Sequence, residues 1–329
     1  LFYSLQLLFE DRLGFTVYTP IGYEWFDQGY WQFGWEHLGR ALADQYLQID
    51  ARYEPREGYW ATFDPAHPLR EIRCVTLDQF RALGDWSYVV ASVQDNQVGF
   101  ARLAFERMAQ YVYQVGNTRQ LVHWGLDPLA LMSTEVAGLG RYVRYHQEMA
   151  DCFRWRDPSE ANNRVIGSFV NLMPRLVDWP LWLGYQSFLP EFATRVYGID
   201  GPDGNLHPVE AIADAMAKCA FGLHLKPTGD GFGHVIHGWA AVGRPLIGKG
   251  VYYRGQLAEP FWQDEITCVD LDQRSPQENA ALIKAIADDP KRHRRMCEAI
   301  WGEFRRLVDY DREADAIAAF LGVERAVAA

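Results

Sequence analysis

The most constraining feature of this sequence is a run of helix, strand, turn and helix patterns in its C-terminal half. Val209–Cys219 has the apolar spacing of an amphipathic helix, and Ala220–Leu225 is a short apolar run of strand length. Pro227–Gly233 is rich in residues that permit unusual backbone dihedrals, and His234–Val242 resumes a helical spacing that ends at Gly243. The sequence therefore predicts a strand joined to a helix by a glycine-rich turn.

A glycine-rich turn that opens a helix is suited to binding an anion. The backbone N–H groups of the first helical turn have no partners within the helix, and the helix dipole adds positive potential there. Together they favour a group such as a diphosphate, and Lys226, just ahead of the turn, adds a cationic side chain. Such turns also occur as plain connections, so the spacing alone leaves both interpretations open.

The order of residues in this segment resembles the donor-binding region of GT-B glycosyltransferases of the retaining, glycogen-synthase-like kind (glycosyl transferases group 1). Asp230–Gly233 reads Asp-Gly-Phe-Gly where that family has Glu-Gly-Phe-Gly. Gly238–Ile247 stands for the family's second block, Glu-Ala-Met-Ala, one residue, then Gly-x-Pro-Val-Ile. The resemblance is specific over this segment and only architectural in the first half of the chain.

The resemblance implies roles for individual residues. In that family the first glutamate contacts the transferred sugar, which makes Asp230 the implied catalytic residue. The second glutamate holds the ribose, but Gly238 stands at its position with His237 beside it. The implied donor-binding set is Arg175, Lys226, Gly231, Phe232, Gly233, His234 and His237. The alternative for both histidines is that they are half-buried polar residues of the helix.

Strand and helix patterns alternate in both halves of the chain, which predicts doubly wound parallel sheets. The expected strands of the first half are Phe15–Pro20, Ile72–Val75, Trp86–Val93, Val112–Val115 and Arg141–His146, and those of the second half include Val165–Asn171, Thr194–Tyr197 and Thr267–Val269. A helix is expected over Phe2–Arg12, and the last helix over Glu298–Phe320.

The resulting fold class is α/β of the GT-B type, with two Rossmann-like domains facing one another across a cleft. The length of 329 residues suits two domains. The polar, proline-containing segment Asp157–Asn163 is the expected boundary. We therefore expect an acceptor-binding domain over residues 1–157 and a nucleotide-sugar-binding domain over residues 164–329.

Composition narrows the class of partner. The formal charge of −11 disfavours nonspecific binding to nucleic acid or to an anionic membrane. The five cysteines are far apart, which predicts free thiols in a reducing cytoplasm and no zinc site. No run approaches the ~20 apolar residues of a membrane span. The chain begins at Leu1 without methionine, which leaves open whether N-terminal residues are missing.

The first half offers a candidate base. Asp95 follows the most apolar strand of that half and would serve an inverting enzyme, whereas a retaining enzyme can pass the acceptor proton to the leaving phosphate. The alternative is that Asp95 caps the helix expected over residues 98–111. Asn117, His146 and Glu148 also follow strands and are expected at the ligand edge. Because no metal-binding spacing appears, we expect a site that needs no metal ion or other cofactor.

The sequence thus predicts a glycosyltransferase that moves a sugar from a nucleotide-diphosphate sugar to an acceptor. The acceptor is a glycan, a small molecule or a modified DNA base, held by a first domain whose early residues are rich in aromatic side chains. Two alternatives remain open: a protein that binds a nucleotide-sugar without catalysis, and a nucleotide-sugar epimerase on the same fold.

Overall fold

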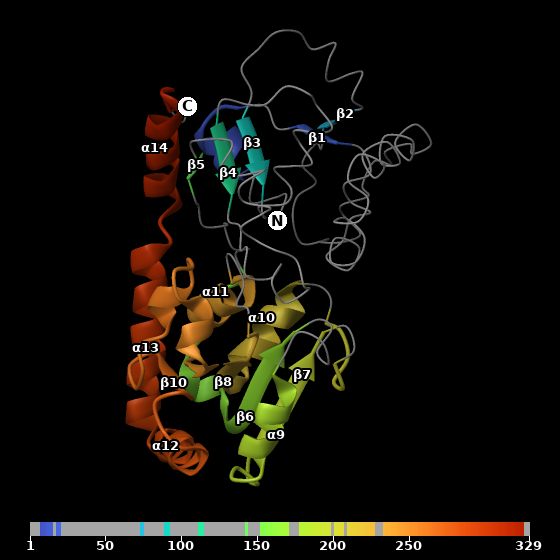
Figure 1. Cartoon of the computed structure of the whole chain (residues 1–329), viewed down its shortest axis with the longest axis vertical. Helices are drawn as coiled ribbons and strands as arrows, with labels where there is room; N and C mark the ends of the chain where they lie inside the picture. Colours follow the sequence, from blue (N-terminus) through green and yellow to red (C-terminus); the bar gives the residue numbers. More distant parts are fainter. Residues whose placement is uncertain are drawn as a thin grey trace. The chain divides into compact units, whose positions relative to one another are not determined.

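The structure is a computed structural model, and it falls into two compact units (Figure 1). Unit 1 comprises residues 1–118, 127–148 and 310–329, and unit 2 comprises residues 119–126 and 149–309. The structure describes residues 7–15, 18–20, 73–75, 89–92, 111–114, 142–143, 152–170, 178–198, 201–206, 209–227 and 233–325.

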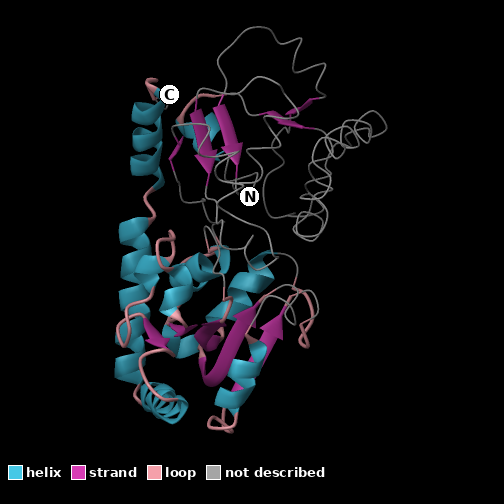
Figure 2. Ribbon diagram, viewed as in Figure 1, coloured by secondary structure: helices cyan, strands magenta, loops and turns pink. Residues whose placement is uncertain are grey.

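Unit 2 is built on a five-stranded parallel sheet with the strand order β10-β9-β8-β6-β7. Figure 2 shows its strands in magenta among cyan helices. Its strands are β6 (Asn162–Phe169), β7 (Ala193–Tyr197), β8 (Cys219–His224), β9 (Leu246–Gly248) and β10 (Cys268–Asp270). The chain runs from β6 outward to β7, then returns to β8 on the other side of β6 and continues outward. This is the doubly wound topology that the sequence predicts, with β9 as a strand that the sequence analysis missed.

Helices cover both faces of this sheet. They are η6 (Pro158–Glu160), α9 (Trp179–Gln186), α10 (Val209–Ala217), α11 (His234–Ala241), η7 (Gly250–Tyr253), η8 (Glu259–Phe261), α12 (Pro276–Asp288) and α13 (Pro290–Leu307). On one face α9 and α12 bury Trp182 and Ile283 against Leu223 of β8. None of the helices among the described residues combines the length and the apolar character that crossing a membrane requires.

On the other face α11 packs close to the sheet through a single tryptophan. Trp239 is fully buried, and its indole ring occupies the space beside two glycines of neighbouring strands. A Cβ atom at Gly222 of β8 would lie 2.4 Å from that ring, and one at Gly167 of β6 would lie 2.8 Å from it. Both strands must therefore carry glycine for the helix to approach this closely.

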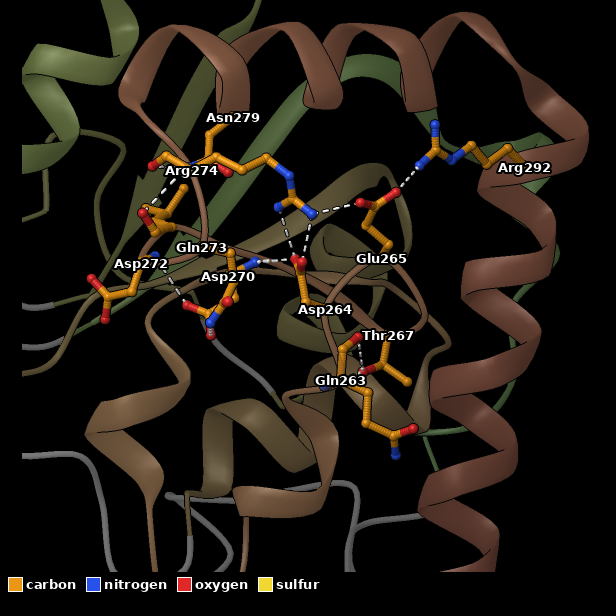
Figure 3. A network of polar contacts seen from close by, with 11 residues as sticks. Gln263, Asp264, Glu265, Thr267, Asp270, Asp272, Gln273, Arg274, Asn279 and Arg292 are labelled. Carbon is orange, nitrogen blue, oxygen red and sulfur yellow. Dashed lines mark hydrogen bonds and ion pairs between the residues drawn. The ribbon is translucent and has the colours of Figure 1, made fainter.

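An ionic network fixes the loops that flank β10 (Figure 3). Arg274 donates to both carboxylate oxygens of Asp264, at 3.2 and 2.6 Å. Glu265 accepts from Arg274 at 2.5 Å and from Arg292 of α13 at 2.6 Å. Among the described non-glycine residues only Glu265 has a positive φ, of 61°. The two arginines stabilise a backbone conformation that is sterically unfavourable for glutamate.

The described residues of unit 1 form two small parallel sheets and two helical segments. Strands β1 (Tyr18–Pro20) and β2 (Arg73–Val75) pair with one another, and β4 (Tyr111–Gln114) lies between β3 (Val89–Ser92) and β5 (Tyr142–Val143). All five lie within strands that the sequence predicts, apart from Tyr111. The helical segment η1 (Leu7–Arg12) packs against the last helix, α14 (Tyr310–Leu321), through a buried cluster that includes Phe9 and Ile317.

The prediction of one helix from Glu298 to Phe320 is wrong. Val308 lies between α13 and α14 with a non-helical backbone (φ −97°, ψ 88°), and its side chain is 9% exposed. The helix therefore ends at Leu307, and α14 belongs to unit 1 while α13 belongs to unit 2. The apolar spacing continues across the break, so the spacing alone does not reveal it.

The polar segment Asp157–Asn163 is built into unit 2. Its first residue, Asp157, caps η6 by accepting a hydrogen bond from the backbone N–H of Ser159 at 2.8 Å, and β6 begins at Asn162. Arg294 of α13 also pairs with Asp157 at 2.7 Å. The limits 1–157 and 164–329 for the two domains stay a prediction.

Candidate functional site

The carboxyl ends of β6 and β8 mark the point where the winding of the sheet reverses. In open α/β sheets ligands bind outside the carboxyl ends of the strands at such a switch point. Strand β8 ends at His224, and α11 begins at His234. The described residues on either side of the glycine-rich turn are therefore the end of a central strand and the start of a helix, as the sequence predicts.

Gly233 shapes the start of α11. It is the N-cap residue and adopts a left-handed conformation, with φ 74° and ψ 52°. That conformation favours glycine, and a Cβ atom here would lie 2.9 Å from the side chain of Ala258. Because glycine has no side chain, Gly233 supplies no side-chain cap to the first turn of this helix.

Lys226 brings a cation to this switch point. It follows Leu225, which is fully buried, and is itself only 8% exposed. The backbone N–H of Asp178 donates to the carbonyl of Leu225 at 2.8 Å, so the chain that returns from β6 lies beside Lys226. A lysine at this depth places its positive charge at the edge of the sheet and not in bulk solvent.

The described residues on either side of the stretch that carries Arg175 are bound to neighbouring strands. The N–H of Val170 donates to the carbonyl of Tyr197 at 2.9 Å, and Asp178 is bound to Leu225 as described. Arg175 itself lies outside the described residues, as do Asp95, Asn117, His146, Glu148, Asp230, Gly231 and Phe232.

The two histidines of α11 differ in their surroundings. His237 is fully buried, its Nδ1 lies 3.0 Å from the carbonyl oxygen of Gly233, and its ring meets Phe261 edge-on at 5.0 Å. These contacts stabilise the first turn of the helix, in line with the alternative interpretation of a buried polar residue. His234 is exposed at the first position of the helix, with its ring 6.4 Å from that of Phe153. A direct role in donor binding stays a prediction for both.

Gly238 is closely packed. A Cβ atom at this position would lie 3.2 Å from Phe153 and 3.3 Å from Met216. A glutamate in its place would have to displace these two side chains. The sequence shows that the second glutamate is missing, but only the structure shows that apolar side chains fill the space beside the glycine.

A polar cluster at the carboxyl ends of β9 and β10 was missed by the sequence analysis. Lys249 pairs with Asp272 at 2.9 Å, and the hydroxyl of Tyr252 donates to Asp178 at 3.4 Å. Burial lowers the pKa of Lys249, but the hydrogen bond to Asp272 and nearby negative charges outweigh it, so its pKa is raised. The available signal was the position of Lys249, directly after the apolar run that forms β9.

In the described part of the chain, the side chains that could bind a metal ion are dispersed and most thiols are buried. No group of three or more His, Cys, Asp or Glu side chains there could hold a metal ion. Cys219, Cys268 and Cys297 are buried thiols without a disulfide, as the sequence predicts for them. Burial raises the pKa of Cys219 to about 12 and that of Cys297 to about 12, which leaves both unreactive.

No protein-family model matches the sequence, and no curated protein matches it. Solved structures do match the fold. The crystal structure of Anabaena Alr3699/HepE in complex with UDP and glucose matches with a TM-score of 0.53 and 15% identity, over 88% of this chain and 83% of that chain. An alpha-glucosyltransferase in complex with UDP and DNA containing an HMU base matches with a TM-score of 0.51 and 13% identity, over 70% of this chain and 79% of that one.

The crystal structure of TarM matches with a TM-score of 0.55 and 7% identity, over 74% of this chain and 57% of that chain. At these identities the likeness shows the fold alone. The predicted fold class, α/β of the GT-B type, is confirmed.

Proposed function

We propose that this protein is a glycosyltransferase that takes a sugar from a nucleotide-diphosphate sugar. The observation that carries the proposal is the start of α11 at the switch point, where the N-cap residue is left-handed Gly233 without a capping side chain, and where the buried residue Lys226 follows the end of β8. This is the arrangement that binds a diphosphate. The fold that it shares with HepE, TarM and the alpha-glucosyltransferase supports the proposal.

Glycosyl transfer requires that the leaving diphosphate be held while negative charge develops on it. The N–H groups at the start of α11 and the ammonium of Lys226 supply that stabilisation, and Arg175 adds to it. Asp230 accepts hydrogen bonds from hydroxyls of the transferred sugar.

UDP-glucose is the first donor to test, because solved structures of similar fold are named with UDP, with glucose or as a glucosyltransferase. Residues 164–329 hold this donor, and residues 1–157 hold the acceptor, which is a glycan, a small molecule or a modified base in DNA. In a retaining reaction the acceptor proton passes to the leaving phosphate. In an inverting reaction Asp95 is the base.

The proposal is tested with purified protein and UDP-glucose in the absence of an acceptor. We expect UDP to raise the melting temperature, since a ligand at a hundred times its Kd stabilises by about 2.7 kcal/mol. We also expect slow release of UDP and glucose by transfer to water. Binding without release favours the non-catalytic alternative, a changed sugar still bound to UDP favours the epimerase, and no binding of any nucleotide-sugar contradicts all three.

A second measurement distinguishes a DNA acceptor from a glycan or a small molecule. A gel shift with duplex DNA, repeated at increasing salt, detects nucleic-acid binding and its dependence on phosphate contacts. The formal charge of −11 leads us to expect no shift at physiological salt. A shift that survives there would favour the DNA acceptor.

A further inference from the structure

Asp178 occupies the N-cap position of α9 but does not cap the helix. Aspartate at an N-cap ordinarily accepts a hydrogen bond from a backbone N–H of the first turn. Asp157 does so at η6, and Asp289 does so at α13, at 2.8 and 3.0 Å. The side chain of Asp178 makes no such bond, and its carboxylate instead accepts from the hydroxyl of Tyr252 in the loop after β9. Its carboxylate is thus directed away from its own helix.

This carboxylate has spare capacity as an acceptor. An ionised carboxylate offers about four lone pairs. The described contacts of Asp178 use one of them, in a bond to Tyr252 of 3.4 Å that is long for two oxygens. Two aspartates at the end of β10 make shorter bonds than Asp178 does. Asp270 accepts from three donors at 3.2–3.3 Å, and Asp272 pairs with Lys249 at 2.9 Å.

The position of Asp178 relative to the anion site points to the sugar half of a nucleotide-sugar. On the other side of the switch point, Phe169 and Tyr197 end the neighbouring strands β6 and β7, and their rings stack at 5.1 Å. Phe169 is buried and Tyr197 is half-buried, so Tyr197 is the ring of this stack on which a nucleobase can lie. Base and sugar lie on opposite sides of the diphosphate, so a base on the β7 side leaves the sugar on the β9 side, where Tyr252 meets Asp178.

We propose that Asp178 and Tyr252 bind hydroxyl groups of the transferred sugar. The inference rests on the proposed function and adds a second carboxylate to the sugar site besides Asp230. The Asp178 carboxylate accepts hydrogen bonds from sugar hydroxyls, and the Tyr252 hydroxyl, already bound to that carboxylate, orients it and offers an acceptor of its own. Both groups contact the sugar and not the nucleotide. Their contribution to affinity can therefore be measured separately from that of the diphosphate site.

The test compares UDP with UDP-sugars on the full chain by calorimetric titration. UDP, UDP-glucose, UDP-galactose and UDP-N-acetylglucosamine are titrated into the wild type, and the tightest of the three UDP-sugars is used for the variants. In Asp178→Asn we expect the Kd of that UDP-sugar to rise about tenfold or more, the scale of one charged hydrogen bond, while the Kd of UDP changes less than twofold. Tyr252→Phe should give a smaller selective loss, of about threefold.

The matched control is Asp272→Asn, because Asp272 lies at the same edge of the sheet but is bound to Lys249. We expect it to change the Kd of UDP and of the UDP-sugar by the same factor. Equal weakening of UDP and UDP-sugar in Asp178→Asn, or no change in either, would overturn the sugar-binding role. If the wild type binds neither UDP nor any UDP-sugar, the proposed function itself fails, which is a different result. Melting temperatures establish that each variant is folded.

Discussion

The backbone N–H of Asp178 donates to the carbonyl oxygen of Leu225 at 2.8 Å. This bond joins the chain returning from β6 to the end of β8, across the point where the winding of the sheet reverses. It holds the N-cap residue of α9 beside Leu225, the residue that precedes Lys226. Asp178 and Lys226, which are far apart in sequence, therefore lie at the same edge of the sheet.

Lys226 is the described side chain whose loss most directly tests the diphosphate site. We expect Lys226→Gln to lower the turnover of UDP-glucose by about 10²-fold, because one charged contact to the developing negative charge is removed. The measurement is UDP release at saturating donor. Lys291→Gln is the control, since Lys291 is exposed on α13 and should leave turnover unchanged. Near-normal turnover in Lys226→Gln would contradict the assignment.

The packing of Trp239 on Gly222 predicts a difference between two glycine substitutions. We expect Gly222→Ala to lower the free energy of unfolding by about 1–3 kcal/mol, because its Cβ would lie 2.4 Å from the indole ring. Gly184→Ala in α9 is the control. Its Cβ meets nothing within 4 Å, and alanine should stabilise that helix by up to about 1 kcal/mol.

Urea denaturation of both glycine variants measures the difference. A double variant, Gly222→Ala with Trp239→Leu, should show less than the sum of the two single losses, because the smaller side chain makes room for the methyl group. Strict additivity would show that the two positions do not interact.

Arg244 is a fully buried cation whose partners are backbone carbonyls. It donates to Ala217, the last residue of α10, at 3.1 and 2.6 Å, and to Arg156 at 3.0 Å. We expect Arg244→Lys to lower the free energy of unfolding by about 2 kcal/mol or more, because lysine cannot reproduce the planar fork and leaves buried carbonyls unsatisfied.

The control for Arg244 is Arg295→Lys on the exposed side of α13, expected to stay within about 0.5 kcal/mol of the wild type. Thermal and urea unfolding report both variants. A wild-type melting temperature for Arg244→Lys would mean that the guanidinium geometry is not needed there.

His293 gives the protein a pH dependence of stability. Burial lowers its pKa below the ordinary value of 6.5, and its Nε2 lies 2.8 Å from the carbonyl oxygen of Ala220. Below about pH 6.5 the unfolded chain takes up a proton that the folded state resists. This contribution to stability is therefore present above that pH and lost as the pH falls through the lower, folded pKa.

Urea denaturation at pH 7.5, 6.5 and 5.5 measures the effect. We expect the difference in unfolding free energy between wild type and His293→Gln to shrink as the pH falls, because glutamine keeps a donor for Ala220 but does not titrate. A difference that is constant over this range would show that His293 has the same pKa in both states.

Much of this protein was determined by the sequence alone. The apolar run Ala220–Leu225 and the helical spacing from His234 predict the strand and the helix of the candidate site, and the structure has both within one or two residues. The glycine-rich turn between them lies outside the described residues. Periodicity succeeds here because each of these elements buries one face locally. The resemblance to GT-B enzymes also came from this one segment, and the fold comparison agrees with it.

The tertiary structure decided what depends on residues that are far apart in the chain. It showed that Trp239 fills the space left by Gly167 and Gly222, and that Val308 breaks the last helix in two. It also brought Asp178 to Tyr252, which are 74 residues apart. Sequence periodicity indicates which face of a helix or strand is buried, but it does not identify the residues that pack against that face. Those contacts form only when the sheet has assembled.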